Sequence, residues 1–78
     1  MEFRIQYFGI HDRLLYAEAM SADELAVALD RARSVLRWAV DTRDSESADL
    51  PIAYVILDER GRSVARGYNR DAITAAMR

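Results

Sequence analysis

Apolar and polar residues alternate along four stretches of the chain, and this period of two predicts four β-strands. The first stretch shows the pattern, with Phe3, Ile5 and Tyr7 on one side of the strand and Arg4 and Gln6 on the other. The predicted strands are residues 2–8, 13–20, 52–58 and 62–68. Turn residues at 9–12 and 58–61 separate them in pairs, so we expect two β-hairpins.

A period of three to four residues lies between the two hairpins and predicts a helix over residues 22–40. Its apolar stripe, expected to face the sheet, comprises Leu25, Ala28, Leu29, Ala32, Val35, Leu36 and Ala39. Ser21 and Glu24 fit a capping box, in which the serine side chain bonds a backbone N–H of the first turn. Residues 41–49 are polar without a period and predict a loop.

At the C-terminal end of the chain, Asn69 fits the N-cap of a short second helix that ends at Met77. The element order is therefore ββαββα. We expect one α+β domain over residues 1–78 with two layers. A four-stranded, mostly antiparallel sheet carries the long helix on one face, and the short C-terminal helix lies at its edge. The layout of the first half, a hairpin and then a capped helix under a sheet, resembles the β-grasp fold of ubiquitin-like proteins. It also resembles small antitoxin domains that have a sheet and a single helix. Both resemblances imply a fold and no function.

The second hairpin divides its side chains between two unlike faces. The segment from Asp58 to Gly61 predicts a type I turn closed by a left-handed glycine. On the first face the expected pairs are Ile52–Tyr68, Tyr54–Arg66 and Ile56–Val64, and Phe8 and Tyr16 from the first hairpin lie beside them. On the second face the expected pairs are Ala53–Gly67, Val55–Ala65 and Leu57–Ser63. We expect the long helix on the second, narrower face, because small residues there let a helix approach closely.

The first face would then expose more apolar area than a monomer usually leaves in water. Three occupants stay open: the C-terminal helix, a second copy of the chain, and another ligand. With another ligand, Tyr54 and Tyr68 would stack on it and Arg66 would add a cation–π or anion contact.

A second candidate surface lies on the long helix, away from its apolar stripe. Val27, Arg31, Ser34 and Trp38 recur at helical spacing, and tryptophan and arginine are frequent in interface hot spots. The alternative is that Trp38 packs under the loop that follows the helix.

The composition excludes several chemistries. All eleven basic residues are arginine, so no lysine is present for a Schiff base or a phosphate loop. The chain lacks cysteine and has one histidine, His11, in a predicted turn, so we expect no metal and no cofactor. A net charge of −2 argues against nucleic acid as a partner.

Residues 55–70, Val-Ile-Leu-Asp-Glu-Arg-Gly-Arg-Ser-Val-Ala-Arg-Gly-Tyr-Asn-Arg, resemble the opening hairpin of the cytidine and tRNA-adenosine deaminases. Those enzymes also need a histidine or cysteine motif and a cysteine pair for zinc. The chain has no cysteine, so the resemblance implies a hairpin and no catalytic residue carries over. Asp58, Glu59 and the acidic residues of the loop form no evident catalytic pair, and we expect no enzyme.

The N-terminal residues form no apolar signal core, and the longest apolar run, Ile52 to Leu57, is far too short for a membrane span. We expect a bacterial, cytoplasmic protein of unknown function that does not bind a membrane. The most favoured function is protein–protein association, with a homodimer as the first state. The alternative is binding of RNA or single-stranded nucleic acid through Tyr54, Arg66 and Tyr68.

Overall fold

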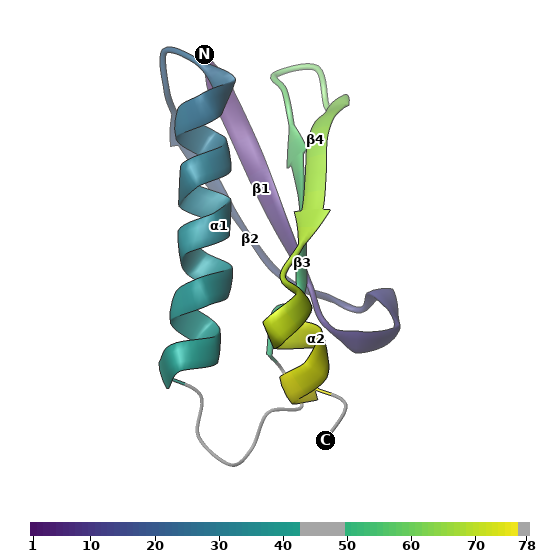
Figure 1. Ribbon diagram of the computed structural model, residues 1–78. Coiled ribbons are helices and arrows are strands. Elements are labelled where there is room, and N and C mark those ends of the chain that lie inside the picture. The colour runs from purple at the N-terminus through teal and green to yellow at the C-terminus, as the bar shows by residue number, and fades with distance from the viewer. Residues whose placement is uncertain (43–49, 77–78) are drawn as a thin grey trace.

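The two hairpins pair through their first strands, which completes a four-stranded antiparallel sheet with the order β2-β1-β3-β4 (Figure 1). The computed structural model describes residues 1–42 and 50–76. The strands are β1 (Glu2–Phe8), β2 (Leu14–Ser21), β3 (Ala53–Leu57) and β4 (Ser63–Tyr68), and the helices are α1 (Leu25–Thr42) and α2 (Arg70–Ala76). The predicted α+β fold is therefore confirmed.

One helix covers one face of the sheet, and the core lies between them. The buried side chains of this core are Phe3, Ile5, Tyr7, Ala28, Ala32, Leu36, Tyr54 and Ile56. On α1 they fall on the apolar stripe predicted from the sequence. The other stripe residues are partly buried: Leu25, Leu29 and Val35 against this core, and Ala39 against a second cluster. Burial of each large side chain is worth about 1.5–3 kcal/mol, so the alternation in β1 and the stripe on α1 specify this layer together.

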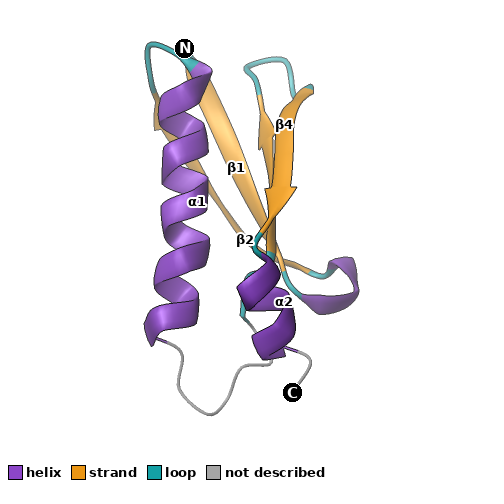
Figure 2. Ribbon diagram, in the orientation of Figure 1, coloured by secondary structure: helices purple, strands orange, loops and turns teal. Residues whose placement is uncertain are grey.

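The short helix α2 packs against the C-terminal part of α1, on the same side of the sheet (Figure 2). Its N-cap is Asn69, as predicted: the side-chain Oδ1 accepts hydrogen bonds from the backbone N–H of Asp71 at 2.9 Å and of Ala72 at 3.3 Å. Ala72 is buried beside Leu50. Within the described residues, α2 therefore leaves the other face of the sheet uncovered. The predicted end of this helix, Met77, lies outside those residues.

The predicted capping box at the start of α1 is wrong. Ser21 is the last residue of β2, and its Oγ donates a hydrogen bond to the Glu2 side chain on the neighbouring strand. The pairing with the N-terminal segment continues one residue further, because the Ala22 N–H donates to the Met1 carbonyl at 2.9 Å. The backbone therefore stays extended through these residues, and the helix starts at Leu25.

The register of the second hairpin also differs from the prediction. The turn is as expected: the Gly61 N–H donates to the Asp58 carbonyl at 3.0 Å, and Gly61 is left-handed with φ of 80°. Leu57 pairs with Ser63, also as expected, but Ile56 then pairs with Ala65. Val64 is thus an extra residue on β4, a β-bulge, and it shifts the pairing beyond it by one.

With this bulge, the β3 side chains lie on the faces opposite to those predicted, whereas Ala65 and Gly67 of β4 stay on the helix side as expected. Tyr54 now pairs with Gly67 instead of Arg66, and it lies on the face that α1 covers together with Ile56. A second irregularity at the end of β1, where Phe8 pairs with Leu14, places Tyr16 opposite Tyr7 on the helix side. The single aromatic face predicted from the sequence therefore does not exist.

Candidate functional site

The structure places the nine predicted interface residues in three separate regions. Tyr54 and Ile56 are in the core with exposed fractions of 4% and 0%, and Ile52 packs beside the second cluster of Leu50 and Ala72. Val64, Arg66 and Tyr68 are exposed on the edge strand β4, and Val27, Arg31 and Trp38 are exposed on α1. Burial removes Tyr54 and Ile56 from the predicted interface, because both face the helix; Tyr54 still lines a cleft beside α1.

The sheet face opposite α1 is open and amphipathic. Phe8, Val55 and Leu57 are half-buried there, but the exposed side chains of Arg4 and Arg66 point to the same side in the strand register. Packing this face against a second copy would remove two like charges per chain from water, which is costly without counter-charges. The open face is therefore a less favourable dimer contact, and its charged side chains are better placed in water.

The flank of α1 that lies over β2 forms a groove, named here the β2 flank. It is lined by Tyr16, Glu18, Arg31, Ser34, Val35 and Trp38. Large apolar side chains at this flank are exposed, with fractions of 67% for Trp38, 45% for Tyr16 and 45% for the neighbouring Val27. The helical spacing of Trp38, Arg31 and Val27 predicted this surface, whereas the contribution of Tyr16 was missed.

The charges of the β2 flank are paired within the chain. The Arg31 guanidinium makes a bidentate ion pair with Glu18, with Nε to Oε1 at 2.7 Å and Nη2 to Oε2 at 3.2 Å. The ring centroids of Tyr7 and Tyr16 lie 4.8 Å apart beside this pair. Burial, followed by the charge of Glu18, raises the pKa of both phenols, so both are neutral at neutral pH. The flank therefore carries exposed aromatic area without net charge.

The adjoining edge of β2 has few of the features that protect sheet edges from pairing. β2 is eight residues long, contains neither proline nor lysine, and its single charge, Glu18, is held by Arg31. The other edge strand, β4, is six residues long, is interrupted by the bulge at Val64, and presents Arg66. Of the two edges, β2 is the better template for an added strand.

On its opposite flank, α1 leaves a cleft in front of β4. A helix is about 10–12 Å wide, whereas four strands spaced about 4.8 Å apart are wider, so one helix covers only part of the sheet. The cleft has a volume of about 550 Å³. Its lining includes four arginines, Arg33 and Arg37 from α1 with Arg66 and Arg70 from the β4–α2 segment, and this grouping was not predicted from the sequence.

The residues considered for catalysis have structural roles or lie apart. The Asp58 carboxylate accepts hydrogen bonds from the backbone N–H groups of Arg60 and Arg62, both at 2.9 Å, and Glu59 accepts one from the Glu2 N–H at 3.1 Å. His11 is exposed in a left-handed conformation within the 3₁₀ turn Ile10–Asp12 that follows β1. In the described ranges no three histidine or acidic side chains gather as a metal site.

Comparison of the chain with models of protein families, with curated proteins and with solved structures finds no match. Among the described residues, no helix has the length and apolar character needed to cross a membrane. The case for a function therefore depends on the two flanks of α1.

Proposed function

We propose that the chain is a protein–protein association module without catalytic activity, and that its first partner is a second copy of itself. The two copies join along the edge of β2 and the β2 flank of α1. The observation that carries this proposal is the free edge of β2 beside the exposed side chains of Trp38 and Tyr16. An added strand satisfies the backbone groups of the edge, and the aromatic groove supplies apolar area.

The β2 flank has the spacing that a twofold-symmetric contact requires. The centre of β2 lies between Ala17 and Glu18. The residues Val27, Arg31, Ser34 and Trp38 are placed symmetrically about a point between Ala32 and Arg33, one residue from the middle of α1. The ion pair between Arg31 and Glu18 brings these two centres close together. A twofold axis there pairs β2 with its copy in antiparallel fashion and sets Trp38 of one copy beside Val27 of the other.

The exposed area supports a dimer of ordinary size. A buried aromatic side chain contributes about 150–250 Å². From their exposed fractions, Trp38 and Tyr16 of two copies would together remove on the order of 500 Å² from water, about half of what a specific interface needs. Strand pairing and the contacts of Val27 and Ser34 supply the remainder. A chain of 78 residues also has a small core, so association adds stability that it otherwise lacks.

The test is the molar mass in solution, measured by light scattering after size exclusion over a range of concentrations. The chain is expected at about twice its 8.9 kDa, and the variant Trp38→Ala is expected as a monomer. A hot-spot truncation costs at least about 2 kcal/mol, and two tryptophans per dimer weaken association about a thousandfold. The matched control is Tyr68→Ala, because Tyr68 is 63% exposed on the other edge strand.

Two results contradict the proposal. A chain that stays monomeric up to about 1 mM has no affinity of the expected size. A dimer that persists in Trp38→Ala and dissociates in Tyr68→Ala uses the β4 edge or the open face instead.

Nucleic-acid binding through an aromatic sheet face is less well supported. Tyr54, which would have been one of its two stacking residues, is 4% exposed and covered by α1. Tyr68 and Arg66 remain available on β4, but two side chains do not form the tract of stacked bases and phosphate contacts that such binding uses.

A further inference from the structure

We infer that the cleft between α1 and β4, named here the arginine cleft, binds the phosphate group of a small molecule. This site is separate from the proposed dimer contact, because Arg33 and Arg37 lie on the flank of α1 opposite Trp38 and Arg31. Four arginines and two aspartates, Asp41 and Asp71, line the cleft. The Arg66 side chain points to the open face of the sheet, so the three other arginines less the two aspartates give the cleft a net charge of +1, whereas the whole chain has −2.

Three arginines of the cleft form no ion pair with any residue that the structure describes. In the part of the chain that the structure describes, Arg33, Arg37 and Arg70 make no side-chain hydrogen bond or ion pair. Arg33 and Arg37 are one helical turn apart on α1, an arrangement of like charges that destabilises a helix by a few tenths of a kcal/mol. An oxyanion between them removes this repulsion, and guanidinium groups bind phosphate through paired N–H donors.

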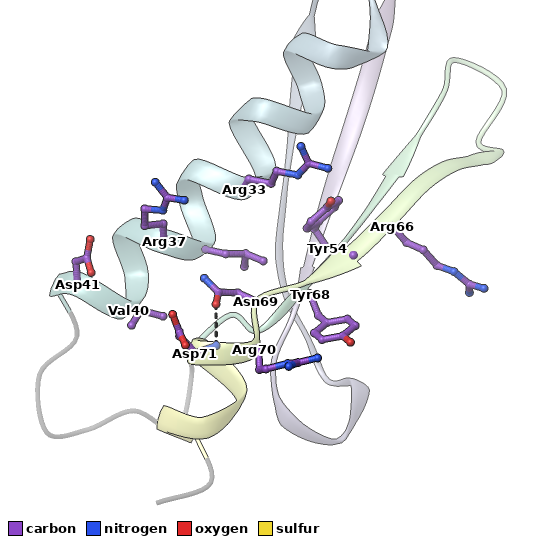
Figure 3. A pocket seen from close by; sticks show the side chains of 12 residues that line it. Arg33, Arg37, Val40, Asp41, Tyr54, Arg66, Tyr68, Asn69, Arg70 and Asp71 are labelled. Atoms are coloured by element: carbon purple, nitrogen blue, oxygen red, sulfur yellow. Dashed lines mark hydrogen bonds between the residues drawn. The ribbon is translucent and has the colours of Figure 1, made fainter.

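The floor of the cleft supplies a further polar group. Tyr54 is 4% exposed, and its ring lies against the Cα of Gly67 because glycine leaves room for it. Its hydroxyl lines the cleft and has no hydrogen-bond partner among the described residues. Figure 3 shows Arg33 extending from α1 toward Tyr54, whereas Arg66 extends away from the cleft. The Tyr54 hydroxyl at the floor of the cleft and the Arg33 guanidinium extending toward it are both suitable donors to phosphate oxygens.

The dimensions of the cleft favour phosphate carried on a small organic body. Its volume of about 550 Å³ falls within the range of about 300–1,000 Å³ typical of small-molecule sites. Tyr68, 63% exposed, and the apolar side chain of Val40 also line it and offer a surface for that body. Free phosphate and a phosphate monoester share the recognised group, and the test separates them.

The experiment is an NMR titration of the ¹⁵N-labelled full chain with inorganic phosphate, and then with adenosine monophosphate, at low ionic strength. The amide signals of Gly67, Asn69 and Arg70 are expected to shift with either probe. A tighter apparent Kd for the nucleotide identifies a monoester as the ligand class, and equal values identify phosphate alone. The variant with both Arg33→Gln and Arg37→Gln is expected to bind at least about tenfold more weakly.

The matched control changes the same number of charges elsewhere, with Arg60→Gln and Arg62→Gln at the tip of the β3–β4 hairpin. This control is expected to keep the affinity within about twofold, because exposed charges at a distance are screened. A further variant, Tyr54→Phe, keeps the ring and removes the hydroxyl, and it is expected to weaken binding by about two- to tenfold.

Three results overturn the inference. The first is that no amide signal shifts with 50 mM of either probe, a concentration on the order of ten times a weak millimolar Kd. The others are signal shifts spread over the whole surface, or an equal loss of affinity in the two double-arginine variants. The molar mass of the Arg33/Arg37 variant is measured alongside. It is expected to equal that of the unmodified chain, so a failure of the cleft remains distinguishable from a failure of the dimer.

Discussion

The substitution Gly67→Ala tests the register of the second hairpin, on which both the core and the arginine cleft depend. A Cβ at this position would lie 2.6 Å from the hydroxyl oxygen of Tyr54 and 2.8 Å from its Cζ. Tyr54 is held under α1 in the core, so relief of this clash requires its ring to leave that packed position and tilt toward the cleft. Had the register predicted from the sequence formed, Gly67 would lie opposite Ala53, where an added methyl group meets no tyrosine.

The two registers therefore predict effects of opposite sign. Overpacking of a core costs about 1–3 kcal/mol, whereas replacing a strand glycine by alanine without a clash gains about 0.5–1 kcal/mol. In the observed register, Gly67→Ala is expected to destabilise the fold by about 1–2 kcal/mol net. For a domain of this size that lowers Tm by roughly 4–16 °C.

Thermal and urea unfolding followed by circular dichroism measure the effect, at one fixed protein concentration because association shifts apparent stability. A double-mutant cycle with Tyr54→Ala isolates the contact: in that background, Gly67→Ala is expected to cost much less than in the unmodified chain. A stabilising or neutral Gly67→Ala would refute the observed register. Gly61→Ala is the contrasting variant, because no atom lies within 4 Å of its Cβ and its cost arises only from the left-handed φ of 80°.

Two further predictions concern the turn and the cap. Hydrogen bonds from the backbone N–H of Arg62 and then of Arg60 lower the pKa of Asp58 in the folded chain. The contribution of Asp58 to stability is therefore complete above the pKa of an unfolded aspartate, near 4, and is lost as the pH falls through the lower folded pKa. Urea midpoints between pH 6 and pH 2 are expected to fall more for the unmodified chain than for Asp58→Asn, and equal slopes would exclude this account. Asn69→Ala removes the acceptor of two backbone N–H groups and is expected to cost about 1 kcal/mol in urea unfolding. Ser21→Ala is expected to change the midpoint by less than half as much, because Ser21 caps no helix in the structure; an equal loss would contradict its position in β2.

The parts of the fold that the sequence predicts are those with local causes. Asp58 and Gly61 define their turn through adjacent backbone groups, Asn69 caps the residues that follow it, and the apolar stripe of α1 repeats at the helical period. Each of these signals lies within a few residues of its effect, and the structure confirms each one.

The errors arose where a distant strand decides between two local options. Ser21 has the sequence of a helix cap, but pairing of β2 with Glu2 on β1 keeps it extended. Val64 has no feature that marks a bulge, yet skipping it turns Tyr54 toward α1 and leaves Ala65 and Gly67 as the small residues opposite. A single extra residue in a strand therefore goes with the loss of three of the nine predicted interface residues, Ile52, Tyr54 and Ile56, to the protein interior.

Both candidate surfaces follow from the position of one helix over a sheet wider than itself. The strands below its two flanks differ: β2 carries Tyr16 and Glu18 upward to meet α1, whereas β4 offers only Ala65 and Gly67 there. On the β2 side these large residues fill the space, so the helix presents Trp38 outward beside a free strand edge, a geometry suited to a second chain. On the β4 side the small residues leave a hollow with Tyr54 as its floor and arginines at its rim, a geometry suited to a small anion. The proposed dimer contact and the proposed anion site lie on opposite flanks of α1, so a substitution on one flank is expected to leave the other unchanged.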